Sequence, residues 1–292
     1  MNKHKALSFL LASTLLAAPC NADNAATNTA GTAKDAQATE QANAPTSSTA
    51  TRSAALQDLI ILILGAYGGP DKLKEIDALA MRAKGKLKEF SSISNAENDF
   101  DCSMVSKGDK LRVEMAILGQ QMITGYDGHE GWMQQGDVIY PTDPASVERI
   151  KVEIKHSLEH ELLDLLDEKA VVEQKGTKEL DGKMCDVLTI KVPDEQLITL
   201  YVDQITHLVA RSEFQGVDAE QGIPAKITND FQDYRLLLGT MEPFRIIEYT
   251  NDKKTTEAIQ ETTENDATIT DALVAAEELM AAGVLRRIVE NA

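Results

Sequence analysis

The sequence predicts an α+β fold in which a strongly curved antiparallel sheet, or an unclosed β-barrel, wraps around helices. About eleven short segments alternate apolar and polar residues, as half-buried strands do, and turn signals separate many of them at hairpin spacing. Two other stretches repeat apolar residues at helical spacing. So many strands around so few helices indicate a highly curved sheet or an open barrel.

The N-terminal 22 residues have the layout of a secretory signal peptide. Lys3 and Lys5 precede an apolar run of about 13 residues, which is shorter than the roughly 20 that a helix needs to cross a bilayer. Residues 20–22 offer the small side chains that a signal peptidase reads, whereas residues 17–20 resemble a lipoprotein box ending at Cys20. We expect a protein of the periplasm, either soluble or tethered to a membrane if Cys20 is lipidated.

Residues 23–53 predict a disordered linker, because a stretch dominated by small and polar residues cannot bury enough apolar area to offset its ordering entropy. The formal charge of the whole chain is −18, and removal of Lys3 and Lys5 with the signal peptide makes it −20. So anionic a surface argues against binding nucleic acid or an anionic membrane face by charge. Any contact with lipid must therefore be hydrophobic.

The main domain opens with a short helical pair. Residues 53–67 carry apolar side chains at helical spacing, the pattern ends at Gly68-Gly69, and Pro70 is suited to the first turn of the next helix. The block 59–64 is apolar on nearly every side of the helix. We therefore expect this block to be buried by something that wraps it.

Five strands follow, over residues 81–90, 99–107, 110–118, 121–126 and 131–135. The third is the clearest, because Leu111, Val113, Met115 and Ile117 face one way while Arg112 points to the outer, solvated face. Between the fourth and fifth strands, Gly128 is expected to take a positive φ in a turn. Trp132 is expected to be an aromatic residue of the core or its rim.

A second helix is predicted over residues 145–169, with one apolar stripe. The stripe consists of Ile150, Ile154, Leu158, Leu162, Leu165 and Leu166. Strands resume over residues 171–178, 183–192, 196–202, 207–215, 225–238 and 243–251. Beyond them, residues 255–265 suggest one last edge strand, and residues 270–288 a helix.

Cys102 and Cys185 both remain in the mature chain, and an oxidising periplasm would permit a disulfide. Cys102 shares the apolar face of its strand, whereas Cys185 lies opposite Leu188, Ile190 and Val192. If both strands turn their apolar faces to one interior, the two thiols point to different sides. A disulfide and two separate thiols both stay open.

Residues 156–160 match the H-x-x-E-H pattern of a family of zinc proteases. Two His residues at i and i+4 of a helix could share a zinc ion, with Glu159 as general base. Leu158 lies on the buried stripe, however, so His156 and His160 are expected on the wet face of the helix. A solvated charged face is the preferred interpretation. No other catalytic or cofactor motif is present, so we expect neither enzymatic activity nor a cofactor or metal.

Four short pieces of the chain, in this order, resemble the outer-membrane lipoprotein-sorting family related to LolA and LolB. They are residues 66–73 (AYGGPDKL), 126–132 (YDGHEGW), 201–208 (YVDQITHL) and 231–235 (FQDYR). The resemblance implies a half-barrel domain over residues 54–268, followed by a helical tail over residues 269–292. It further implies that acyl chains of a lipid or lipoprotein lie in the apolar space between the barrel and its helices.

The candidate ligand-binding residues are the apolar ones on the inner faces of two strands: Leu111, Val113, Met115, Ile117, Leu188, Ile190 and Val192. The expected partner is a lipid or an acylated lipoprotein, with a possible association with the outer membrane and no nucleic acid. The same residues would equally form an ordinary packed core. The alternative is therefore an envelope structural or protein-interaction module with a filled core.

Overall fold

The computed structural model of the 292-residue chain describes residues 52–77, 80–90, 97–107, 110–117, 120–136, 138–193, 195–218, 221–265 and 286–287. Within these ranges the chain forms one 14-stranded sheet and four helices. The predicted signal peptide and nearly all of the predicted linker lie outside the described residues. No helix in the described part of the chain is long and apolar enough to cross a membrane.

The sheet is antiparallel throughout except at one end, and its strands run in the order β14-β6-β5-β4-β3-β2-β1-β13-β12-β11-β10-β9-β8-β7. No ladder among the described residues joins β7 to β14, so the sheet is not closed. The strands are β1 Ala80–Phe90, β2 Glu97–Lys107, β3 Lys110–Ile117, β4 Gln120–Tyr126, β5 Gly131–Gln135, β6 Val138–Pro141, β7 Val171–Leu180, β8 Lys183–Lys191, β9 Leu197–Asp203, β10 Val209–Val217, β11 Pro224–Leu237, β12 Thr240–Thr250, β13 Lys253–Asn265 and β14 Arg286–Arg287.

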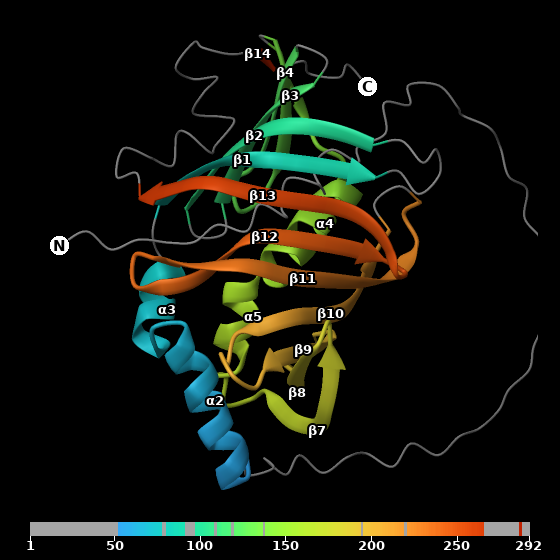
Figure 1. Cartoon of the computed structure of the whole chain (residues 1–292). Helices are drawn as coiled ribbons and strands as arrows, with labels where there is room; N and C mark the ends of the chain where they lie inside the picture. Colours follow the sequence, from blue (N-terminus) through green and yellow to red (C-terminus); the bar gives the residue numbers. More distant parts are fainter. Residues whose placement is uncertain are drawn as a thin grey trace, which may run out of the picture.

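The helices are α2 Ala54–Ala66, α3 Pro70–Asp77, α4 Pro144–Lys155 and α5 Leu158–Asp164. In Figure 1 six neighbouring strands cross the view one below another, in the order β2, β1, β13, β12, β11 and β10. Helices α4 and α5 lie behind them, and α2 runs along the lower left. This arrangement is the unclosed, strongly curved sheet around helices that the sequence predicts.

One predicted edge strand is central. The polar, Thr-rich segment β13 pairs with β12 on one side and β1 on the other, and so joins the two halves of the sheet. Its Glu257 accepts hydrogen bonds from Arg245 of β12 (2.7 Å) and from Lys254 of β13 itself (2.6 Å). Its Ala258 is buried against the core. The edge assignment from composition alone was therefore wrong.

Helix α2 has the predicted ends. The Ser53 hydroxyl accepts from the Leu56 amide (3.2 Å), and after Tyr67 the Gly69 amide donates back to the Leu64 carbonyl (2.8 Å). The expectation that its apolar block is wrapped on all sides was wrong. One face of the helix packs on the sheet, while Ile61 and Leu62 on the other face are 66% and 49% exposed.

The second predicted helix is two helices. Asp143 caps the start of α4, accepting from the Ser146 amide (3.0 Å), and the helix ends at His156; Ser157 is extended (ψ 148°) before α5 begins. The break separates the apolar stripe into two parts. Ile150 of α4 joins one buried cluster, whereas Leu158, Leu162 and Leu165 of α5 join another.

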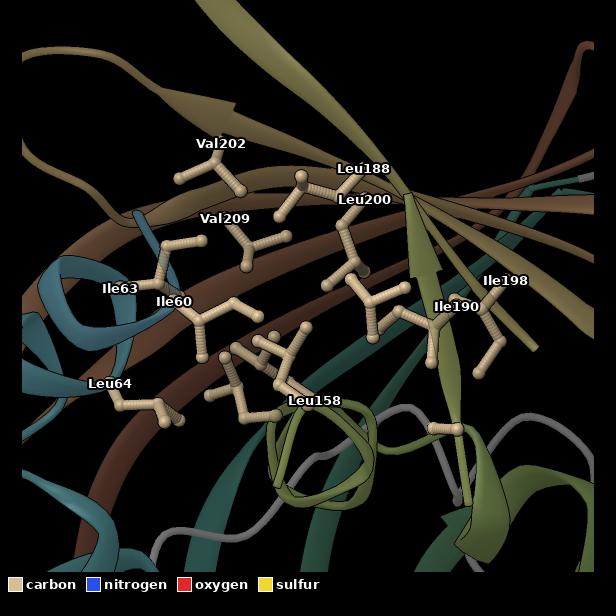
Figure 2. Close-up of a cluster of buried hydrophobic side chains, with 14 of the residues drawn as sticks. Ile60, Ile63, Leu64, Leu158, Leu188, Ile190, Ile198, Leu200, Val202 and Val209 are labelled. Atoms are coloured by element: carbon tan, nitrogen blue, oxygen red, sulfur yellow. The ribbon is translucent and has the colours of Figure 1, made fainter. Parts of the chain in front are cut away.

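Two buried apolar clusters fill the inner face of the sheet. The first joins α2 and α5 to strands β7 to β12, and the second joins α4 to strands β1 to β4 and β13. Figure 2 shows the first cluster, in which Ile60, Ile63 and Leu64 of α2 and Leu158 of α5 point toward the aliphatic side chains of the strands. Burial of these side chains is the main favourable contribution to the fold.

The two cysteines are free and buried, so the predicted alternative of two separate thiols holds. Cys102 lies in the second cluster and Cys185 in neither. The predicted C-terminal helix falls outside the described residues except for Arg286 and Arg287. Those two residues form strand β14, parallel to β6, and are not helical.

Candidate functional site

The candidate ligand-binding residues lie on the inner face, as expected, but in two different places. Leu111, Val113 and Met115 belong to the second cluster, under α4. Leu188, Ile190 and Val192 belong to the first cluster, under α2 and α5. The side chain of Ile117 lies outside what the structure describes. The candidate residues thus mark two ends of one curved apolar surface and do not converge on one point.

Helix α2 is fixed to the sheet by a closed chain of hydrogen bonds at Tyr67. The Val209 amide donates to the Tyr67 hydroxyl (2.9 Å), the two tyrosine hydroxyls are 2.9 Å apart, and the Tyr234 hydroxyl donates to the Val209 carbonyl (2.8 Å). The β10–β11 ladder begins at Arg211, so the backbone groups of Val209 lie beyond it. The two tyrosines therefore take the place of a neighbouring strand for Val209.

Three of the four pieces that carried the family resemblance meet here. Tyr67 belongs to the first, Tyr234 to the fourth, and the third ends directly before Val209. In the third piece Asp203 accepts from the amides of Ile205 (2.8 Å) and Thr206 (3.0 Å) and so shapes the turn between β9 and β10. These pieces explain how α2 is held against the strands, and none of them supplies a reactive group.

The remaining piece, residues 126–132, is the predicted turn. Asp127 accepts from the amides of His129 (2.9 Å) and Glu130 (2.8 Å), and Gly128 has a φ of 95°. Trp132 is fully buried, and a Cβ added to Gly125 would meet its indole at 2.2 Å. The prediction that this piece is structural agrees with the geometry.

The wet face expected for His156 was wrong. Its ring is 5% exposed and stacks on Phe214, with ring centroids 3.9 Å apart and an interplanar angle of 10°. The helix break turns this side chain inward toward β10. His160 instead shares a hydrogen bond with the Ser157 hydroxyl (2.8 Å). Among the described residues, no group of three or more His, Cys, Asp or Glu residues is arranged to hold a metal ion.

Burial changes the ionisation of the residues at the break. Burial, with smaller effects of Lys155 and His160, lowers the pKa of His156 to about 4. Burial also raises the pKa of Glu161 well above its usual value, although the Ser212 hydroxyl opposes the shift. The His156 Nδ1 and Glu161 Oε1 atoms are 3.9 Å apart. Burial thus disfavours the charged form of both side chains.

The sequence did not reveal a buried polar row on the inner face of the sheet. Ser212 of β10 pairs with Asn229 of β11, Asn229 with Glu248 of β12, and Glu248 with Thr256 of β13. All four are buried. A signal was present, because Asn229 interrupts the inward series of Ala225, Ile227 and Phe231 that its strand otherwise presents.

No protein-family model matches the sequence, and no curated protein matches it. Similar solved structures include a LolA superfamily protein of Nitrosomonas europaea, 15% identical, covering 74% of this chain and 96% of that one with a TM-score of 0.46. A second is a domain of Vibrio parahaemolyticus described as an outer membrane lipoprotein-sorting protein (11% identical; 74% and 96% covered; TM-score 0.45). A third is a DUF1329 family protein of Desulfovibrio piger (12% identical; 76% and 98% covered; TM-score 0.49).

The assignment of an unclosed, strongly curved antiparallel sheet rests on the strand order and pairings of this chain.

Proposed function

We propose that the inner face of the half-barrel binds a lipid or the acyl chains of a lipoprotein, and that the protein is a carrier or receptor in the bacterial envelope and not an enzyme. The observation that carries the proposal is the kind of side chain that covers this face. Two apolar clusters lie on strands from both halves of the sheet, and short, separate helices cover them mainly with aliphatic side chains. An acyl chain could replace those side chains without loss of backbone hydrogen bonds in the sheet.

The energies of such an exchange are of similar size. An acyl chain of about 16 carbons gains about 12 kcal/mol on full burial, at about 0.8 kcal/mol per CH₂. Displacement of Leu158, Leu162 and Leu165 of α5 would expose three buried leucines, at about 1.5–3 kcal/mol each. A ligand would therefore bind with a modest net gain, which suits a protein that must also release its cargo.

The signal peptide and the charge support the place of action. An exported, strongly acidic chain is expected in the periplasm, soluble or tethered through Cys20. Association with the outer membrane would then depend on the anchor or on the cargo, because the net charge does not favour an anionic membrane face. We accordingly expect no binding of nucleic acid.

The test begins with the mature protein purified from the periplasm, analysed by native mass spectrometry and lipid extraction. We expect a bound acyl species, and displacement of a fluorescent fatty-acid probe by added lipid. Met115→Arg and Ile190→Arg each place a charge in one cluster and should abolish uptake. Ala116→Arg is the matched control, because Ala116 is the exposed neighbour of Met115 on the opposite face. Circular dichroism shows whether each variant is folded.

A filled core favours the second candidate, an envelope structural or protein-interaction module. The six candidate residues whose side chains are described are all at most 9% exposed without any ligand, and α2 presents Ile61 and Leu62 to solvent. An apo mass for the wild-type protein, together with no uptake of the probe, would replace the carrier proposal with this one.

A further inference from the structure

The buried polar row defined by Ser212, Asn229, Glu248 and Thr256 crosses four adjacent strands in register. Apolar residues flank it on the same face: Ile227 and Phe214 lie on one side, and Phe231 and Ile246 on the other. A polar row inside an apolar surface is energetically unfavourable unless its groups find hydrogen-bond partners. The polar groups of the row therefore need hydrogen-bond partners on the inner side of the sheet.

Polar side chains from the helices lie next to the Ser212 end of the row, over β10. Glu161 of α5 is fully buried next to the Ser212 hydroxyl, and the His156 ring lies on Phe214, two residues further along the same strand. The polar groups thus come from the sheet on one side and from the α4–α5 break on the other. They face the interior at one position, between the helices and the strands.

Several of these groups make no hydrogen bond of ordinary geometry with a described residue, although the Ser212 hydroxyl lies close enough to the Glu161 carboxyl to lower its pKa. They are the Nδ1 atom of His156, both carboxyl oxygens of Glu161, the Ser212 hydroxyl and the Asn229 side-chain oxygen, and all of them are buried. Glu248 differs, because it accepts from the Thr255 hydroxyl at a bulge of β13 (3.0 Å). Buried polar atoms without a protein partner are typical of sites that hold ordered water or a polar group of a ligand.

The chemistry of the set selects the kind of ligand group. Burial disfavours the charged forms of His156 and Glu161, lowering the pKa of the first and raising that of the second. Burial also raises the pKa of Glu248 to about 7, with Asp218 adding to the shift. Together with His156 and Glu161, the row contains hydroxyl, amide, carboxyl and imidazole groups and no Lys or Arg. It offers hydrogen-bond donors and acceptors and no cation to pair with a carboxylate or phosphate, and the partly ionised Glu248 would repel either anion.

We propose that this row, with His156 and Glu161 above it, is a subsite for the neutral hydrogen-bonding part of an acylated ligand, namely the ester, amide or hydroxyl groups of an acylglycerol. The acyl chains would lie on the apolar surfaces at either side. This inference rests on the proposed function and adds a preference: neutral acylglycerols over free fatty acids and phospholipids with the same chains.

The test compares monooleoylglycerol with oleate at pH 7.4, as competitors of a fluorescent acyl probe on the full mature protein. We expect the wild type to bind monooleoylglycerol at least about tenfold more tightly, the factor that 1.4 kcal/mol corresponds to. Asn229→Leu and Ser212→Ala replace row members with apolar side chains and should reduce that preference while oleate still binds. Gln215→Leu, which replaces an exposed amide on the outer face of β10, is the matched control and should keep the preference.

The outcomes separate the two proposals. If neither competitor displaces the probe, the proposed function fails. If both displace it equally in the wild type, or if Asn229→Leu and Ser212→Ala retain the full preference, the acyl site stands and the polar subsite is overturned, with the row holding only water. A thermal denaturation curve for each variant confirms that the comparison is made on folded protein.

Discussion

Replacement of Tyr67 by Phe removes one hydroxyl from the closed chain of hydrogen bonds that holds α2. The Val209 amide then loses its acceptor and the Tyr234 hydroxyl loses its neighbour, while the two rings keep their edge-to-face contact, with centroids 6.1 Å apart. A buried donor without a partner costs about 1–3 kcal/mol, and the second lost hydrogen bond about 0.5–1.5 kcal/mol. We expect Tyr67→Phe to lower the free energy of unfolding by about 2–4 kcal/mol.

Urea denaturation followed by circular dichroism measures this change, and Tyr140→Phe on the edge strand β6 is the matched control. Tyr140 is 38% exposed, so its variant should stay within about 0.5 kcal/mol of the wild type. Tyr67→Phe combined with Tyr234→Phe should cost less than the sum of the single changes, because the two hydroxyls belong to one chain of hydrogen bonds. Additive costs, or a Tyr67→Phe variant as stable as the control, would refute the reasoning.

The other predictions concern the turn after α2 and the α4–α5 break. Gly68→Ala should destabilise the protein by more than about 1 kcal/mol, because Gly68 has a φ of 89° and an added Cβ would meet the Gly239 carbonyl oxygen at 2.3 Å. Gly65 lies within α2 and has open space around its Cα. Gly65→Ala should therefore stabilise the protein by about 0.5–1 kcal/mol in the same denaturation assay. The pKa of His156 is lowered to about 4 in the folded state, so the unfolded chain binds more protons than the folded one below about pH 6.5. The stability of the protein should therefore decline as the pH falls from about 6.5 to 4. His156→Gln should flatten that decline in thermal melts. The raised pKa of Glu161 has the opposite effect, because the stability of the folded state then decreases as the pH rises. Glu161→Gln should therefore raise the melting temperature more at about pH 8 than at about pH 4. An equal increase at both pH values would contradict the burial of the protonated carboxyl.

Local patterns predicted the strands well because a half-buried strand imposes a period of two residues wherever it lies in the sheet. Leu111, Val113 and Met115 therefore appear on the inner face as expected. Local patterns do not predict where in the sheet a strand lies. The polar composition of β13 suggested an edge, yet its Glu257 pairs with Lys88 of β1, far away in the chain, and only the folded sheet brings these two strands together.

The second helix shows a different limit. Its apolar stripe continues through residues 156 and 157 without a change of period, so the pattern predicted one helix. The break depends on the extended Ser157 and on the two clusters that receive the two halves, neither of which local periodicity contains. The expected exposure of His156 followed from that one assumption and was wrong with it. The same break brings His156 and Glu161 over the polar row, which no motif indicated.

The broken helix and the polar row belong to the same feature of the fold. A single curved sheet carries two apolar clusters, and α4 and α5 each cover one of them because the chain turns between them at His156 and Ser157. The row begins at Ser212, under that turn, and continues away from it across β11 to β13. An ordinary core gains nothing from unpartnered buried polar atoms at the point where its two covering helices meet. A surface that receives acyl chains on both sides of a polar linkage would use them, and the preference for acylglycerol over fatty acid decides between these two interpretations.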